Sequence, residues 1–547
     1  MAPNPTLVRA IGLRALTLTV VTSAIGSGWL FAPLQAARLA GPWALWAWAL
    51  GGLLSFCLAL VFAELGSLLP HSGAIAAIPL LTHGRLAGFI VGWSAWLAYL
   101  ALPTVESLAV MQYLASSLPW LTRDGSAGQV LSPAGLLLAA LLLLVLTTIN
   151  LAGVRTLARW ITGLTLWKLV IPLLTSITLM VHAGHWGNLA VGTPASLGQG
   201  VNGVVSAIGA GGILFSLLGF RSAMDLAGET RNPQRTVPLA MALGLAIVLV
   251  IYLLLQLAFL VAVPPAALER GWGGLVLTAH GGPMVALAMG AGLGWVTRLL
   301  LFDAVLSPSA TAMAYQSAAS RVGWMMARCG LLPAPLAQLN RQRVPGMALA
   351  ISLLVGVSML LLGPTWKQVV SFLTASLVIS LAMGPVSLLA LRRQLPDAPR
   401  AFRLPFARTW CAVAFVLATW AISWCGRSAT SGAVSVILLP ALVLVALHRL
   451  GWRFGAAQQP PLNLLSGLWW FAYLGGIVAI SGLLGPGASG PGASAGIGLQ
   501  LLALAAWGLL LLPLAVRSAL GSPSAFAMQA CQDLQEHENN PPANYSH

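Results

Sequence analysis

The chain has 547 residues, of which 58% are hydrophobic and 7% are charged, against about 25% charged in typical soluble domains. So few charges cannot cover a water-soluble surface, which excludes a soluble enzyme, a nucleic-acid reader and a disordered scaffold. The net charge of +16 comes from basic residues spread along the chain in small groups, so no nucleic-acid partner is expected. The composition predicts an all-α, polytopic membrane protein in a lipid bilayer.

Long apolar stretches recur through the sequence and predict fourteen membrane spans, each near or above the ~20 residues that cross a bilayer. The predicted spans are 15–38, 43–69, 86–117, 132–151, 157–181, 201–228, 237–262, 294–320, 346–363, 367–391, 409–426, 430–447, 464–484 and 497–516. The stretch 264–293 is predicted to be an outer loop with short helical pieces.

Arginine and lysine positions orient these spans. With the N-terminus in the cytoplasm, nineteen basic residues fall inside, four outside and four within spans. This asymmetry is what the positive-inside rule requires. We therefore expect a multi-pass protein of the bacterial cytoplasmic (inner) membrane with both termini cytoplasmic. The start of the chain has no clear cleavage site, so the first helix is expected to remain in place.

Four regions follow from this layout. They are a cytoplasmic N-terminus at 1–14, a transporter core at 15–391, additional spans at 392–516 and a cytoplasmic disordered tail at 517–547. The core is expected to contain two inverted five-helix repeats, at about 15–181 and 201–391. The glycine-rich stretch 485–496 is predicted to be a flexible outer loop.

Two spans carry helix-breaking sequences at corresponding places. The first contains SAIGSGWLFAP at 23–33, and the sixth contains SAIGAGGILFSLLGF at 206–220. Each glycine costs a helix roughly 1 kcal/mol relative to alanine, and membranes tolerate broken helices only beside a cavity or inside protein. Paired breaks predict an inverted-repeat transporter with its site at mid-membrane. Close helix packing through small residues is the alternative.

Several motifs resemble one transporter family. They resemble motifs of the amino acid–polyamine–organocation superfamily. The motifs are IGSGWLFAP, FAELGSLLPHSGA (62–74), the stretch 215–238 with Glu229, Asn232 and Pro233, SRVGWMMARCGLLP (320–333) and RAFRLP (400–405). The resemblance covers about residues 10–450. Within the superfamily, GSGWLF, GFRSAMDLAGE and LFDAVLSPSAT resemble bacterial aspartate:proton symporter-like permeases. The resemblance implies proton-coupled amino acid uptake, with no enzymatic activity.

The breaks themselves suit an amino acid. The N–H groups of Ser27 and Gly28 begin the outer half-helix, whose partial positive charge favours a carboxylate. Freed carbonyls from Phe215 to Leu218 favour an ammonium. The resemblance implies the same contacts and makes Phe215 an aromatic lid, whereas a lipid-facing or packing role is the alternative. The substrate-binding residues are expected to be Ser23, Ile25, Gly26, Ser27, Gly28, Phe215, Ser216, Leu218 and Gly219.

Charged residues inside spans are candidates for proton coupling. Lys168 lies nine residues beyond Arg159, roughly 13 Å into the membrane. The resemblance implies that its ammonium contacts free carbonyls at the first break; snorkelling to the interface is the alternative. Glu106 and Asp303 are expected to carry protons or face the substrate path, unless each sits in a fixed pair, such as Asp303 with Arg298.

Arg221 departs from the family pattern, in which many relatives carry an acid. It is expected either to bind a substrate side-chain carboxylate as a specificity residue or to pair with Asp225. Glu64 and Glu229, near cytoplasmic ends, are expected to lock loops through salt bridges.

No cofactor, metal or nucleotide is implied, and the sequence does not define the oligomeric state. Two other functions stay open. One is an amino acid/amine exchanger of the same fold, and the other is a membrane sensor or integral-membrane enzyme.

Overall fold

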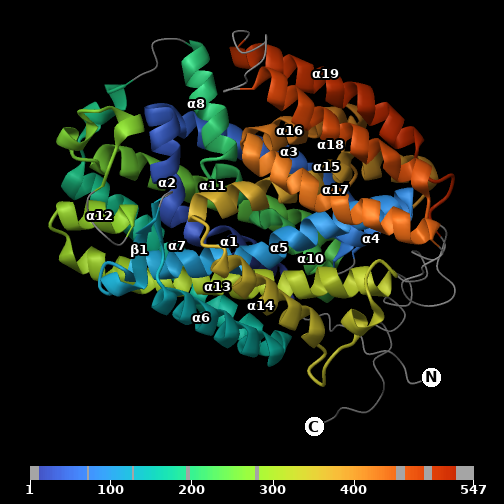
Figure 1. Cartoon of the computed structure of the whole chain (residues 1–547), viewed down its shortest axis with the longest axis horizontal. Coiled ribbons are helices and arrows are strands. Elements are labelled where there is room, and N and C mark those ends of the chain that lie inside the picture. The colour runs from blue at the N-terminus through green and yellow to red at the C-terminus, as the bar shows by residue number, and fades with distance from the viewer. Residues whose placement is uncertain are drawn as a thin grey trace.

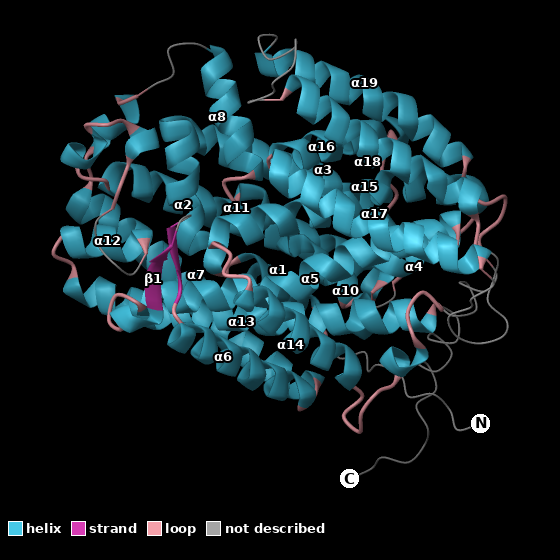
Figure 2. Ribbon diagram, viewed as in Figure 1, coloured by secondary structure: helices cyan, strands magenta, loops and turns pink. Residues whose placement is uncertain are grey.

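The computed structural model describes residues 11–70, 73–125, 128–192, 197–277, 282–450, 462–485 and 496–524. Nearly all of this part is helical (Figure 2), which confirms the predicted all-α class. The regular strands described are β1 (Thr122–Gly125) and β2 (Gly128–Leu131), which form one antiparallel hairpin. Predicted features at 1–10, 486–495 and 525–547 lie outside the described residues.

Each predicted span coincides with helix. The helices are α1 (Leu13–Ala24) with α2 (Ser27–Ala40), α3 (Ala44–Leu68), α5 (Arg85–Leu114), α6 (Pro133–Leu151), α7 (Val154–Ala183), α8 (Leu197–Gly209) with α9 (Ile213–Leu217) and α10 (Ser222–Asp225), α11 (Pro233–Ala262), α13 (Gly294–Arg328), α14 (Gly346–Leu361), α15 (Trp366–Gln394), α16 (Ala407–Trp424), α17 (Arg427–Arg449), α18 (Leu464–Leu484) and α19 (Gly496–Arg517).

Fewer than fourteen of these helices look like spans by length and apolar character. Ten stretches in the described chain qualify, or eleven with the bent pair α8–α9. The difference has three sources. Helices α2 and α3 form one continuous stretch of 42 residues, α14 has only 16 residues, and α13 carries Asp303 and several hydroxyl groups in its middle. The passage of each helix through a bilayer remains a prediction.

Two connections contain short helices. The predicted outer loop holds two 3-10 turns (Pro265–Leu268 and Trp272–Gly274) and α12 (Pro283–Gly290), as expected for short helical pieces. Helix α4 (Ala74–His83), between α3 and α5, was not anticipated, because its ten residues are too few to produce a span signal.

The two predicted breaks are present. Helix α1 ends at Ala24 and α2 begins at Ser27, so Ile25 and Gly26 separate them. Helices α8 and α9 are bent by 52° across their break. Gly212 there has φ +87°, a left-handed conformation that residues with a Cβ rarely adopt. A second irregularity follows, because the α-helix gives way to a 3-10 turn at Leu218–Arg221.

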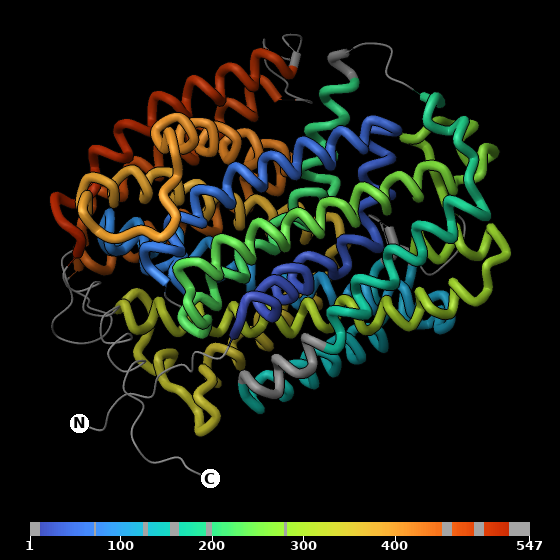
Figure 3. The backbone as a smooth tube through the Cα atoms, turned by 180° about the vertical axis from the view of Figure 1, so that it is seen from behind, coloured from blue at the N-terminus to red at the C-terminus, as the bar shows by residue number. Residues whose placement is uncertain are grey.

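The broken spans pack against each other in antiparallel order, seen as the dark-blue and green helices in Figure 1 and from behind in Figure 3. A Cβ built on Gly219 would lie 2.7 Å from the Cβ of Ala24, so the backbones approach closely. The contacting pairs along the two spans are Ala24 with Gly219, Gly28 with Ser216, Ala32 with Gly212, and Leu39 with Gly203. Inverted repeats predict this order, and the repeat boundaries stay a prediction.

Helices α16 to α19 form a group beside the core and are tied to it through α4. The buried His83 ring lies 3.0 Å from the Ala515 carbonyl in α19. Beyond α19, the Leu520 and Ser524 amides donate to carbonyls of α4 at 2.9 and 3.0 Å. Residues 518–524, placed in the predicted disordered tail, are therefore docked on the core.

This junction should be sensitive to acid. Burial lowers the pKa of His83 to about 4, and its bond to the Ala515 carbonyl opposes that shift. The neutral ring therefore stabilises the fold fully above the unfolded-state pKa of about 6.5, and this stability, roughly 3 kcal/mol, is lost as pH falls toward 4.

We expect the thermal midpoint in detergent to fall between about pH 7.5 and about pH 5 more steeply in wild type than in His83→Gln, which cannot titrate there. Equal slopes in the two proteins would show that His83 does not report on this junction.

Candidate functional site

Lys168 reaches the break between α1 and α2 from α7. Its ammonium donates to the Thr22 carbonyl at 3.0 Å and to the Thr311 hydroxyl at 2.6 Å, and the side chain is fully buried. The side chain therefore does not snorkel to the interface. A carbonyl freed at the end of α1 is instead satisfied by a charge-bearing group.

Helix α13 supports the same break with two hydroxyl groups. The Thr311 hydroxyl lies 2.9 Å from the Thr22 carbonyl and 3.2 Å from the Ile25 carbonyl, and it donates to one of them at a time. Ser307, one turn earlier, donates to Ile25 at 3.3 Å. Sequence reasoning missed Thr311, whose only signal was its place one helical turn after Ser307 in a polar stretch.

Glu106 occupies the opposite side of the break. Its Oε2 accepts the Ser27 N–H at 2.7 Å, while Oε1 has no hydrogen-bond partner among the described residues. A Cβ at Gly26 would lie 2.7 Å from Oε1, so only glycine allows this approach. The positive end of α2 thus holds the protein's own carboxylate. Binding of a substrate carboxylate at the Ser27 amide stays a prediction, and it requires Glu106 to give up this hydrogen bond.

Aromatic side chains lie beside the start of α2. The Trp366 indole donates to Ser27 Oγ at 3.0 Å, stacks on Phe31 at 5.0 Å and meets Phe215 edge-on at 6.1 Å. Phe215 is buried, which rules out a lipid-facing position. Trp366 begins α15, and sequence reasoning did not include it.

The remaining predicted binding residues surround the contact between the broken spans. Ser216 lies against Gly28, and Gly219 lies against Ala24. Tyr252, which was not predicted, donates to the Ala24 carbonyl at 2.8 Å. Ser23 is buried in the last turn of α1, and Leu218 begins the 3-10 turn.

Asp303 is near enough to Lys168 for the two charges to interact, although the two side chains form no ion pair among the described residues. It is fully buried in α13, and neither carboxylate oxygen has a hydrogen-bond partner among the described residues. Arg298 is not its partner, because that guanidinium is at the exposed end of α13 and donates to Gly294 at 3.4 Å. The alternative of a fixed pair with Arg298 is therefore wrong.

Tyr99 lies between Arg221 and Asp225 and contacts both side chains. The Arg221 guanidinium lies over the Tyr99 ring, 4.9 Å from its centroid, and the Tyr99 hydroxyl donates to Asp225. Arg221 also donates to Ser380 at 3.1 Å. Within the described chain no direct ion pair joins Arg221 to Asp225, and Arg221 Nη2 and Asp225 Oδ1 have no partner. A buried arginine therefore retains a donor for another group.

The predicted salt bridges of Glu64 and Glu229 are confirmed. Glu64 pairs with Arg392 at 2.6 Å and with Arg400 at 3.3 Å. Glu229 pairs with Arg321 at 2.5 Å. These carboxylates join distant connections and are not free for transport chemistry.

Comparison with known proteins identifies the family. The amino acid permease family matches residues 11–445. The chain belongs to the amino acid permease family. It is 31% identical to the glutamate/serine transporter AimA of Bacillus subtilis over 86% of this chain and 87% of that protein. It is 30% identical to the aspartate-proton symporter of the same organism over 84% of this chain and 87% of that protein.

The fold is shared with a solved transporter. A manganese transporter of Eremococcus coleocola is 14% identical, with a TM-score of 0.51 over 94% of this chain and 98% of that one. The family match and these relatives make the chain a multi-pass membrane permease of the amino acid–polyamine–organocation superfamily, which transports amino acids and is not an enzyme.

Gly28 offers a direct test of the break as a binding site. A side chain at Gly28 would collide with Ser216 and approach the Tyr252 hydroxyl at 3.1 Å. Gly28→Leu should therefore abolish amino acid binding at the break, which removes most of the amino acid bound by the purified protein, while leaving membrane insertion intact. Gly432→Leu in α17, where a Cβ meets nothing within 4 Å, is the matched control and should bind normally. Unchanged affinity in Gly28→Leu would place the site elsewhere.

Proposed function

We propose that this permease takes up an amino acid, preferably an acidic one, by proton symport with alternating access. The observation that carries the proposal is the break in the first span, where Glu106 and Lys168 hold the two interrupted ends. The break is buried and lies against the second broken span, and its backbone amides and carbonyls bond to side chains instead of to their own helix.

Glu106 gives a physical reason for coupling substrate to a proton. While ionised, it occupies the positive end of α2 through the Ser27 amide. Protonation weakens that hold, because a neutral carboxyl is a poorer acceptor. The substrate carboxylate then takes the Ser27 and Gly28 amides. Proton and amino acid enter together, since each favours the binding of the other.

Lys168 acts at the other end of the break. Its hydrogen bond to Thr22 fixes the end of α1 while the ammonium is charged. Loss of the proton removes charge assistance from this bond and frees α1 to move relative to α7. We assign Lys168 the role of holding the break in one conformation. The Thr311 hydroxyl accepts from Lys168 in α7 and contacts the Thr22 carbonyl in α1, so it joins these two helices.

Arg221 supports an acidic substrate. Arg221 is the last residue of the 3-10 turn Leu218–Arg221, which lies in the second broken span, and its Nη2 has no hydrogen-bond partner among the described residues. The relatives described as a glutamate/serine transporter and an aspartate-proton symporter carry acidic amino acids. A side-chain carboxylate would complete the hydrogen bonding of this buried guanidinium.

The proposed setting is the cytoplasmic membrane of a bacterium, with both termini inside. An exchanger of the same fold is the second candidate, because nothing in the break geometry requires a net proton flux. Counterflow in proteoliposomes without a proton gradient distinguishes the two. Exchange without net uptake would favour the exchanger.

Lys168→Ala should eliminate concentrative uptake. Substrate binding, made mainly by backbone groups at the breaks, should fall less. The measurement is uptake into proteoliposomes under an imposed proton or sodium gradient, alongside equilibrium binding. A proton gradient alone should drive wild-type uptake.

Uptake driven by sodium alone, or a Lys168→Ala protein that still concentrates substrate, would remove Lys168 from the coupling mechanism. Glu106 and Asp303 would then be tested as Glu106→Gln and Asp303→Asn.

Arg221→Ala should weaken acidic amino acids selectively. Loss of one charge-assisted contact corresponds to roughly a tenfold rise in KM for aspartate or glutamate, with little change for serine. Ser380→Ala is the control, because it removes a partner of Arg221 without removing the charge. A neutral amino acid that competes best in wild type would contradict this role for Arg221.

A further inference from the structure

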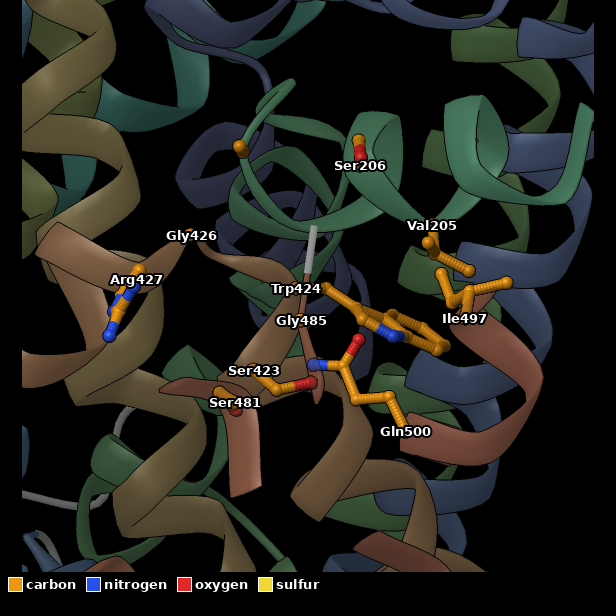
Figure 4. Close-up of a pocket in the computed structure, with 11 residues that line it drawn as sticks. Val205, Ser206, Ser423, Trp424, Gly426, Arg427, Ser481, Gly485, Ile497 and Gln500 are labelled. Atoms are coloured by element: carbon orange, nitrogen blue, oxygen red, sulfur yellow. The ribbon is translucent and has the colours of Figure 1, made fainter. Parts of the chain in front are cut away.

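A polar pocket lies where the additional helices meet the outer half of the second broken span. Its volume is about 150 Å³, roughly that of five water molecules in the liquid. It is distinct from the break in the first span. Figure 4 shows side chains from α8, the α16–α17 turn, α18 and α19 around it. The polar lining residues are Ser206, Ser423, Trp424, Arg427, Ser481 and Gln500.

This pocket contains donors that the described protein does not satisfy. Ser481 is buried, yet its hydroxyl has no hydrogen-bond partner among the described residues. The Trp424 indole N–H also has no hydrogen-bond partner among the described residues. Gln500 is only 4% exposed and presents an amide to the same space. Buried polar groups without partners are uncommon in native structures and call for a ligand or water.

The electrostatics of the pocket favour an anion. Helix α17 begins at Arg427, and its N-cap residue Gly426 is part of the lining. A Cβ at Gly482 would lie 3.3 Å from Arg427 Nη2, so a glycine leaves room for the guanidinium beside Ser481. None of the described residues that line the pocket is acidic. Arginine and a helix N-terminus together attract oxyanions.

The pocket also adjoins the hinge of the broken span. Ala210, inside the bend between α8 and α9, contributes to the lining. The backbone of the α16–α17 turn packs on the end of α8, because a Cβ at Gly209 would lie 2.7 Å from the Cys425 nitrogen. A group bound in the pocket would therefore contact both the additional helices and the bend.

We propose that this pocket is an oxyanion-binding site, which takes the carboxylate of a free amino acid or the phosphate of a lipid headgroup. The bound oxyanion joins Arg427 and Gln500 to the outer half of the broken span. The additional helices then do more than pack on the core, because they carry a second ligand site at the hinge.

The test uses the full-length protein in nanodiscs of phosphatidylcholine, with labelled L-aspartate as the first probe and inorganic phosphate as the second. Binding to wild type is compared with Gly28→Leu, Arg427→Gln and Arg427→Lys. Gly28→Leu should retain a binding component that Arg427→Gln weakens about tenfold and Arg427→Lys weakens much less. Phosphate should bind competitively with this component.

A second arm identifies a lipid source. The same proteins are purified from membranes containing phosphatidylglycerol, and retained phospholipid is counted. If the ligand is a headgroup, Arg427→Gln should lose retained lipid relative to wild type and to Arg427→Lys. Added phosphatidylglycerol should also displace the Arg427-dependent aspartate.

The proposal is overturned if two variants behave like wild type in aspartate binding, phosphate binding and retained lipid. The variants are Arg427→Gln and the double variant Ser481→Ala, Gln500→Leu, and a normal elution profile shows that each is folded. The same experiment distinguishes a failure of this proposal from a failure of the proposed function. Loss of aspartate in Arg427→Gln, with Gly28→Leu equal to wild type, would support the pocket and remove the central site.

Discussion

The structure depends on one interrupted helix whose free backbone groups are buried inside the protein. The break at Ile25 and Gly26 leaves carbonyls at the end of α1 and amides at the start of α2. An unsatisfied peptide group in the hydrocarbon region costs several kcal/mol, so these groups need partners from other helices. Lys168, Thr311, Ser307 and Glu106 provide them, and their positions are fixed by that requirement. Two of these four side chains, Lys168 and Glu106, carry titratable groups.

Much of this arrangement was predictable from local sequence. Apolar length indicated where the helices lie, and glycine density located both breaks. Lys168 was conspicuous because a lysine in the middle of an apolar span has few structural reasons to be there. The resemblance to known permeases supplied the family. Helix α4 and the docked residues 518–524 were not predictable, since neither is long enough to give a periodic signal.

The partners at the break were harder to predict because they lie far away along the chain. Nothing near Ser27 indicates that Glu106, 79 residues later, accepts its amide. Trp366, 339 residues from Ser27, was missed for the same reason. The span at 294–320 was predicted, although α13 is less apolar than most of the other spans. Its polar residues include Ser307 and Thr311, which bond to the break.

The distance between the break and its partners has a consequence for biogenesis. Thr311 follows Thr22 by 289 residues, so a ribosome making about 5 to 20 residues per second needs roughly 15 to 60 seconds to supply it. During that interval the first span is in or near the membrane with its interruption incomplete. The free backbone groups of the first span therefore lack their final partners until more than half of the 547 residues have been made.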